Sequence, residues 1–197
     1  MKESNYEAAR HEYSVLKLAR VELRNAVSDI DALRSWEDIL TRCGRIYNKL
    51  DGGASGKSQQ WWGRKRTERK KDELLRYAHH ARNADTHGIA PIAAPSKAIV
   101  LTASDQGGGW INSFWVGQNG EITLDVKDGN GRPIDPRGFV AINRWGLIEV
   151  TDSGKNYPAP RSHLGQPIDP NNIITVVDLL HAYMGKMVEE AEALLKR

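Results

Sequence analysis

Apolar and polar residues follow two different periods along this chain, one typical of helices and the other of strands. Near the N-terminus the apolar residues recur every three or four positions, which is the spacing that places them on one face of an α-helix. We therefore predict a helix over residues 5–30, with an apolar face of Tyr6, Ala9, Tyr13, Leu16, Leu23, Val27 and Ile30. A second helix is predicted from Ser35 to Leu50, because a serine hydroxyl can accept hydrogen bonds from the free amides at a helix start.

Two further helices are predicted, one before residue 88 and one at the C-terminal end of the sequence. The first covers residues 60–85 and is basic in its first half, whereas its second half carries Leu74, Leu75, Ala78 and Ala81. Gly88 and the prolines of APIAAPSK end it, since proline lacks the amide that a helix needs. The other begins at residue 171 or 172, and its apolar face is Ile174, Val177, Leu180, Met184, Met187, Ala191 and Leu194.

Between these helices the pattern is that of strands. Continuous or alternating apolar runs occur at 98–103, 110–116 and 121–126 and again from residue 139, and DGNG at 128–131 is a turn signal. Residues 152–170 contain four prolines and are predicted to be a loop. The fold class is therefore α+β: residues 1–90 and 171–197 form a bundle of about four helices, and a small antiparallel β unit at 97–151 precedes the last helix.

Charge is distributed unevenly along the sequence. The formal net charge is +3, but residues 57–71 contain seven basic residues and one acid, so this segment carries +6 and the rest of the chain −3. A basic block of this kind is typical of a surface that binds a polyanion, although a solvated helix face has the same composition. The candidate RNA-binding residues are Arg64, Lys65, Arg66, Arg69 and Lys70. Trp61 and Trp62 could stack on bases, but we favour their anchoring of the helix in the core.

Cysteine content and hydropathy indicate the compartment. Cys43 is the one cysteine, which excludes an intramolecular disulfide framework and suits a reducing environment. No apolar run reaches the length of about 18 residues that a membrane span needs. We expect a cytoplasmic protein that does not enter a membrane.

Two further motifs do not fit the sites that they suggest. GGASGKS resembles part of a phosphate-binding loop, but Asp51 stands where the motif needs its first glycine and a helix precedes it. His79, His80, Asp85 and His87 could suggest a metal site, but adjacent histidines point about 100° apart on a helix. No metal or other cofactor is therefore expected.

The segment ARNADTHG at 81–88 carries the strongest candidate chemistry. Arg82 lies about 20° from Leu75 around a regular helix, so its guanidinium is at the edge of the packing face and needs a partner or a function. Asp85, three residues later, can pair with it, which would give the pair a purely structural role.

The string RNADTH, from Arg82 to His87, resembles the HEPN superfamily, in which an arginine followed by a polar residue precedes a histidine by four to six positions. The resemblance implies a small helical bundle, often dimeric, that cleaves RNA without a metal. It implies catalytic roles for Arg82, Asn83 and His87 and a supporting role for Asp85. A histidine titrates near neutral pH, and an arginine can bind a phosphate through two hydrogen bonds.

Residues five positions apart on a regular helix point about 140° away from each other. Arg82 and His87 therefore meet only if the helix ends before His87 or if two protomers share the site, and the resemblance favours a homodimer. The predicted function is a metal-independent endoribonuclease with a toxin or phage-defence role, acting on RNA, with an antitoxin or defence-system partner protein. The alternative is an inactive module of the same fold that binds RNA, a partner protein or, through the β unit, a small ligand.

Overall fold

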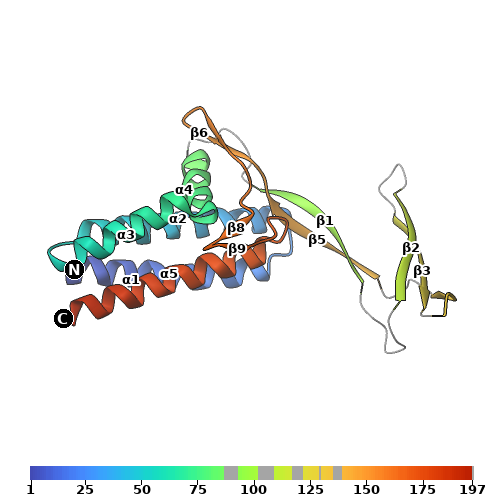
Figure 1. Cartoon of the computed structure of the whole chain (residues 1–197), viewed down its shortest axis with the longest axis horizontal. Helices are drawn as coiled ribbons and strands as arrows, with labels where there is room; N and C mark the ends of the chain where they lie inside the picture. Colours follow the sequence, from blue (N-terminus) through green and yellow to red (C-terminus); the bar gives the residue numbers. More distant parts are fainter. Residues whose placement is uncertain (87–92, 102–108, 117–121, 129, 135–138, 197) are drawn as a thin grey trace. The chain divides into compact units, whose positions relative to one another are not determined.

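The computed structural model describes residues 1–86, 93–101, 109–116, 122–128, 130–134 and 139–196. The chain divides into two compact units, of which one contains Met1–Ser96 and Arg144–Arg197 and the other Lys97–Asn143. The predicted order of elements is confirmed: helices come first, antiparallel strands follow, and a helix comes last (Figure 1).

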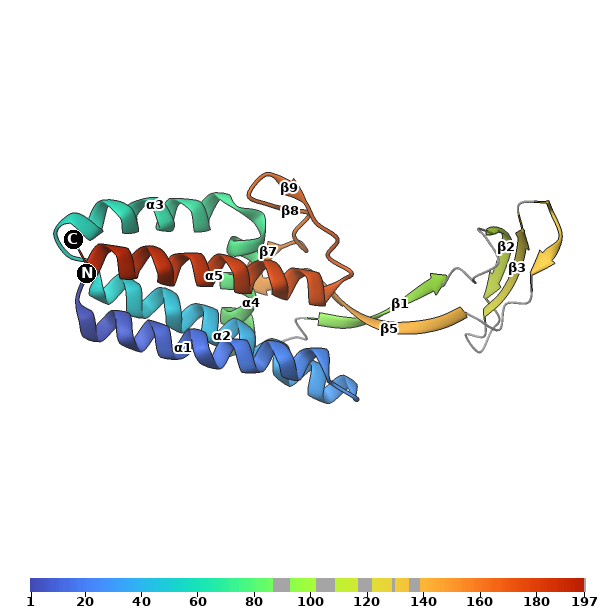
Figure 2. The same ribbon diagram turned by 90° about the horizontal axis from the view of Figure 1, so that it is seen from below.

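The first unit is a helical bundle. Helices α1 (Glu3–Arg24), α2 (Asp29–Gly53), α3 (Lys57–Lys71) and α5 (Ile173–Leu195) run alongside one another, and α4 (Glu73–Thr86) takes a different direction (Figures 1 and 2). The side chains predicted to face the core in α4 and in most of α5 are buried, which confirms those two faces. The centre of the core includes Trp36, Ile39, Leu50, Leu74, Leu180 and Met184. No helix in the part of the chain that the structure describes is long and apolar enough to cross a membrane.

The boundary between α1 and α2 differs from the prediction. The first helix ends at Arg24, and α2 begins at Asp29 because the Ser28 hydroxyl accepts a hydrogen bond from the Asp31 amide at 3.1 Å. Val27 is therefore 95% exposed instead of lying on a buried face. Ser35, the predicted helix start, is buried inside α2. A serine followed by acidic residues occurs at Ser28 as well, and the Ser28 position is the one that the chain uses as the helix cap.

Residues 60–85 form two helices instead of the single helix that was predicted, so the described residues contain five helices. The break is at Asp72, whose backbone is extended with φ −76° and ψ 129°. Its carboxylate accepts a hydrogen bond from the Leu75 amide at 2.8 Å, which caps α4. The same carboxylate lies 3.0 Å from Nδ1 of His163 and accepts the Leu164 amide at 2.6 Å. These contacts fix the corner between α3 and α4.

The segment predicted to be a proline-rich loop contains two short hairpins. Strand β6 (Val150–Asp152) pairs with β7 (Lys155–Tyr157), and β8 (Ser162–His163) pairs with β9 (Gln166–Pro167). Both hairpins turn through two residues with positive φ, which are Ser153 and Gly154 in one and Leu164 and Gly165 in the other. This is the turn type that matches the twist of a hairpin. Leu164, with φ +48°, occupies a conformation that costs an L-residue about 1–2 kcal/mol.

The remaining strands form two separate sheets. In the second unit, β2 (Gly109–Val116) pairs with β3 (Ile122–Asp128), which pairs with β4 (Pro133–Ile134). The turn after β3 is closed by the Asp128 carboxylate, which accepts the amides of Asn130 and Arg132, each at 2.8 Å. Strands β1 (Ala93–Leu101) and β5 (Phe139–Leu147) form a separate two-stranded sheet. The predicted small antiparallel sheet before the last helix is thus present.

Candidate functional site

The RNADTH segment begins in the last turns of α4. Ala81 and Ala84 are buried there, and Arg82 and Asn83 are half-buried. Asp85 belongs to α4, but its side chain lies outside what the structure describes, and so does the whole of His87. The predicted roles of Asp85 and His87 therefore stay predictions, whereas Arg82 and Asn83 have defined surroundings.

The Arg82 side chain passes close to the backbone of α2 at Gly44. A Cβ atom added at Gly44 would lie 2.6 Å from Cδ and 2.9 Å from Nε of Arg82. Real side chains do not approach this closely, so the absence of a side chain at position 44 makes room for the arginine. The Arg82 side chain therefore occupies space that any larger residue at position 44 would fill.

Arg69 and His79 join Arg82 around one small cavity. Its volume is about 10 Å³, enough for a single water molecule, and α2, α3, α4 and α5 all contribute to its wall. The Arg69 guanidinium lies over the ring of Tyr47, 4.6 Å from its centre. Among the residues with described positions, no carboxylate comes within salt-bridge distance of Arg69. The cluster therefore brings two guanidinium groups and an imidazole together.

The surroundings of His79 keep its imidazole neutral. The pKa of His79 is lowered to about 4, mainly by burial and also by the positive charges of Arg69 and Arg82 and by the neighbouring His80. A neutral imidazole beside guanidinium groups can accept a proton once an anion binds, because the anion offsets the positive charge. Guanidinium groups bind phosphate and a neutral imidazole can take up a proton, but the cavity itself has room for one water molecule and not for a phosphate group.

Asn83 and His80 are bound to a carboxylate that the sequence analysis did not single out. The buried Asp152 of β6 lies with Oδ2 2.7 Å from Nδ1 of His80, and it accepts the Asn83 amide at 3.1 Å. The hydrogen bond from His80 is the main reason that the pKa of Asp152 falls to about 2, although burial acts in the opposite direction. An ionised carboxylate only accepts, so Nδ1 of His80 carries the proton, and in the neutral ring Nε2 has the lone pair.

The His80 ring is also fixed by stacking. Its centre lies 3.6 Å from that of Tyr157 in β7, with 12° between the two planes. Asp152 and Tyr157 are both in the segment predicted as a loop, more than 70 positions from His80, and no local pattern marks them as its partners. Asn83, which the resemblance places in catalysis, also holds this hairpin to α4.

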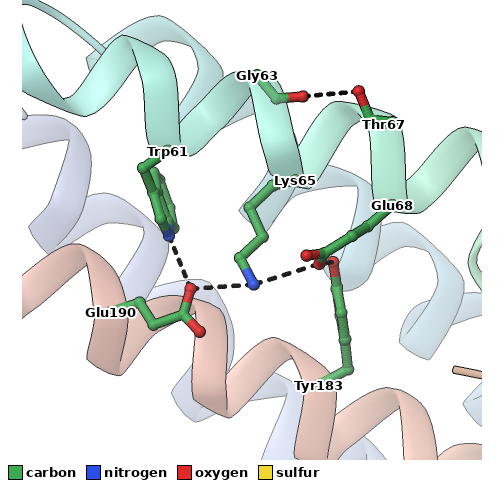
Figure 3. Close-up of polar contacts among 7 residues, drawn as sticks. All are labelled: Trp61, Gly63, Lys65, Thr67, Glu68, Tyr183 and Glu190. Atoms are coloured by element: carbon green, nitrogen blue, oxygen red, sulfur yellow. Dashed lines mark hydrogen bonds and ion pairs between the residues drawn. The ribbon is translucent and has the colours of Figure 1, made fainter.

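Lys65 does not have the position expected of an RNA-binding residue. It is 6% exposed, and its Nζ lies 2.9 Å from Oε2 of Glu190 and 3.3 Å from Oε2 of Glu68. Figure 3 shows that these contacts join α3 to α5, with Trp61 donating to Glu190 at 2.7 Å and the Tyr183 hydroxyl donating to Glu68 at 2.8 Å. Lys65 is therefore an interior cation with two partners, and its assignment to RNA binding is withdrawn.

The exposed basic residues of α3 lie on two separate faces. At 100° per residue, Arg66 and Lys70 point within about 40° of each other, Arg64 and Lys71 within about 20°, and the two pairs diverge by about 130°. The exposed Gly63 and Thr67 lie in the 130° between them, and the buried Trp61 and Lys65 are on the opposite side of the helix. Arg66 and Lys70 are on the side where Trp62 and Arg69 contact α2, through Asp51 and Tyr47. We call the first pair the Arg66 face and the second the Arg64 face.

The two tryptophans of α3 anchor the helix. Trp61 and Trp62 are 6% and 5% exposed, and the indole N–H groups donate to Glu190 and to Asp51 respectively. The core interpretation is therefore confirmed, and neither ring is available for stacking on a base.

No three His, Cys, Asp or Glu side chains within the described ranges are grouped so that they could hold a metal ion. Comparison with known proteins gives no relative: no family model, curated protein or solved structure matches the chain. The functional interpretation therefore rests on the residues themselves.

Proposed function

We propose that this chain is a metal-independent endoribonuclease of HEPN type, with a toxin or phage-defence role in the cytoplasm. The observation that supports it best is the placement of Arg82 on Gly44, beside Arg69 and a neutral His79. That arrangement places guanidinium groups from α3 and α4 beside the RNADTH segment, where they supply hydrogen-bond donors and positive charge.

The reaction needs two proton transfers and one stabilised anion. A base removes the proton of the RNA 2′-hydroxyl, the 2′-oxygen attacks phosphorus, and the bond from phosphorus to the 5′-oxygen breaks. An acid protonates that 5′-oxygen, leaving a 2′,3′-cyclic phosphate. Arg82 binds the negatively charged phosphorane, His87 transfers a proton, and Asn83 keeps the catalytic role that the resemblance implies while it holds Asp152.

A homodimer completes the proposed site. On a regular helix the side chains at positions 82 and 87 diverge by about 140°, so we propose that Arg82 of one protomer acts with His87 of the other. RNA reaches this seam along the Arg66 face and Arg69, which lie on the α2 side of α3.

The test is cleavage of single-stranded RNA in the presence of a chelator. Replacing Arg82 or His87 by alanine should lower the rate by about 100-fold or more, with unchanged circular dichroism. Arg76→Ala is the matched control, because Arg76 is an exposed arginine of the same helix. The proposal is wrong if the wild-type chain leaves RNA intact with and without metal, or if Arg82→Ala and His87→Ala cut RNA at the wild-type rate.

One observation favours the alternative of an inactive module that binds RNA, a partner protein or a small ligand. Asn83, one of the three residues assigned to catalysis, is engaged with a buried carboxylate, which gives it a structural role. Under this alternative the wild-type chain binds single-stranded RNA or another partner without cutting RNA.

A further inference from the structure

A groove lies on the Arg64 face of α3, against the hairpin of β8 and β9. Its volume is about 790 Å³ and its walls are mostly apolar. The residues that matter for its chemistry are Arg64, Thr67, Glu68, Lys71, Asp72 and Leu164. None of them belongs to the cluster around Arg82.

The acidic residues of this groove are already used by the protein. The Glu68 carboxylate accepts from the Tyr183 hydroxyl and pairs with Lys65. Asp72 caps α4 and binds His163 and the Leu164 amide. Arg64 and Lys71, by contrast, have no salt-bridge partner among the described residues, since no carboxylate there lies at salt-bridge distance from either of them. The groove therefore presents positive charge to solvent and suits an acidic partner.

Leu164 adds an apolar side chain to the lining of the groove. It is 57% exposed and has a positive φ in a two-residue turn, a position where asparagine or glycine is usual. Hydrogen bonding of its amide to Asp72 holds the turn against α3. A large exposed side chain kept in an unfavourable backbone conformation is the kind of feature found at binding sites.

These features favour a protein over a nucleic acid. Proteins that hold single-stranded RNA without sequence preference stack bases on exposed aromatic rings, and none of the residues that line this groove is aromatic. A mostly apolar wall that includes two cations matches a segment that carries both carboxylates and an apolar side chain. We propose that this groove binds an acidic segment of a partner protein, with an apolar side chain against Leu164 and carboxylates beside Arg64 and Lys71.

The experiment selects dodecapeptides from a random phage-displayed library on the full chain and measures the affinity of the enriched peptides by calorimetry. We expect peptides that combine Asp or Glu with Leu, Ile or Phe. Their affinity should fall at least tenfold for Leu164→Asn and for the double variant R64Q/K71Q. The matched control is R66Q/K70Q, which removes the same charge from the other face of α3 and should bind these peptides as the wild type does.

Leu164→Asn separates binding from folding. Asparagine tolerates a positive φ better than leucine does, so the variant should melt at the wild-type temperature or above it. The proposal is overturned if no acidic peptide is enriched, or if the enriched peptides bind all the variants equally. It is also overturned if R64Q/K71Q weakens binding of a 2′-O-methylated oligouridylate as much as R66Q/K70Q does while no peptide is retained, since the groove would then be an RNA surface. None of these outcomes depends on whether the chain cleaves RNA.

Discussion

Replacing Lys65 by methionine distinguishes an interior cation from an RNA contact. Methionine keeps most of the length and apolar volume of the side chain and removes the ammonium group. Glu190 and Glu68 then lose a partner, but Glu190 keeps its hydrogen bond from Trp61 and Glu68 keeps that from Tyr183. The change should therefore lower the free energy of unfolding without affecting the binding of RNA.

The size of the loss follows from the exposure of the three side chains. Removing one partner of a fully buried ion pair costs about 3–5 kcal/mol, whereas a surface pair contributes about 0–1 kcal/mol. The Lys65 side chain is 8% exposed, but the Glu190 and Glu68 side chains are 31% and 40% exposed, so water can solvate the carboxylates that remain. We expect a loss of about 2 kcal/mol, which for a chain of this size lowers Tm by about 4–8 °C.

The assay is urea unfolding followed by the circular dichroism of the helices, for Lys65→Met, Glu190→Gln and the double variant. Because the two side chains are in contact, the double variant should lose at least about 0.5 kcal/mol less than the sum of the single losses. Binding of a 2′-O-methylated oligouridylate is measured in parallel. An unchanged free energy of unfolding together with weaker RNA binding would refute the assignment of Lys65 to the interior.

Three other variants test the site and its surroundings. His79→Gln should make the free energy of unfolding less sensitive to acid. The unfolded chain takes up a proton at His79 near pH 6.5 and the folded chain only near pH 4, so the free energy of unfolding of the wild type falls in this interval by at most about 3 kcal/mol. Equal urea midpoints at pH 7 and pH 4 in the wild type would contradict this. Gly44→Ala should displace Arg82 and lower RNA cleavage at least about tenfold with little change in Tm, and cleavage at the wild-type rate would show that the path of Arg82 over Gly44 is unimportant. R66Q/K70Q should make the slope of the logarithm of the RNA binding constant against the logarithm of salt concentration shallower by up to about two. An unchanged slope would show that the Arg66 face does not contact RNA.

The helical faces could be predicted from the sequence because apolar periodicity depends on neighbouring residues. Leu74, Leu75 and Ala78 follow it and are buried as expected. The cap of α5 was also predictable, since the Asn172 side chain accepts the Thr175 amide, a local interaction. Local signals were misleading where two candidates competed, as Ser35 and Ser28 did for the start of α2.

Contacts between distant residues could not be predicted in this way. Lys65 belongs to a run of basic residues that is typical of a solvated surface, and only the packing of α5 brings Glu190 to it. His80 and Asp152 are 72 positions apart, and neither lies in a motif that indicates the other. The break at Asp72 was missed because KKDELL is compatible with a continuous helix, and the residues that stabilise the corner come from β8 and its turn.

The position of Asp72 in the sequence affects how the chain folds during synthesis. Its two tertiary partners, His163 and Leu164, follow it by 91 and 92 residues, and a ribosome adding about 5–20 residues per second makes that stretch in roughly 5–18 s. Until then the Asp72 carboxylate has only the Leu75 amide from its own helix, and Lys65 lacks the carboxylate of Glu190. The contacts of the α3–α4 corner with β8 and its turn, and those of α3 with α5, therefore form only after translation of the β unit, and until then α3 has only the preceding helices and α4 to pack against.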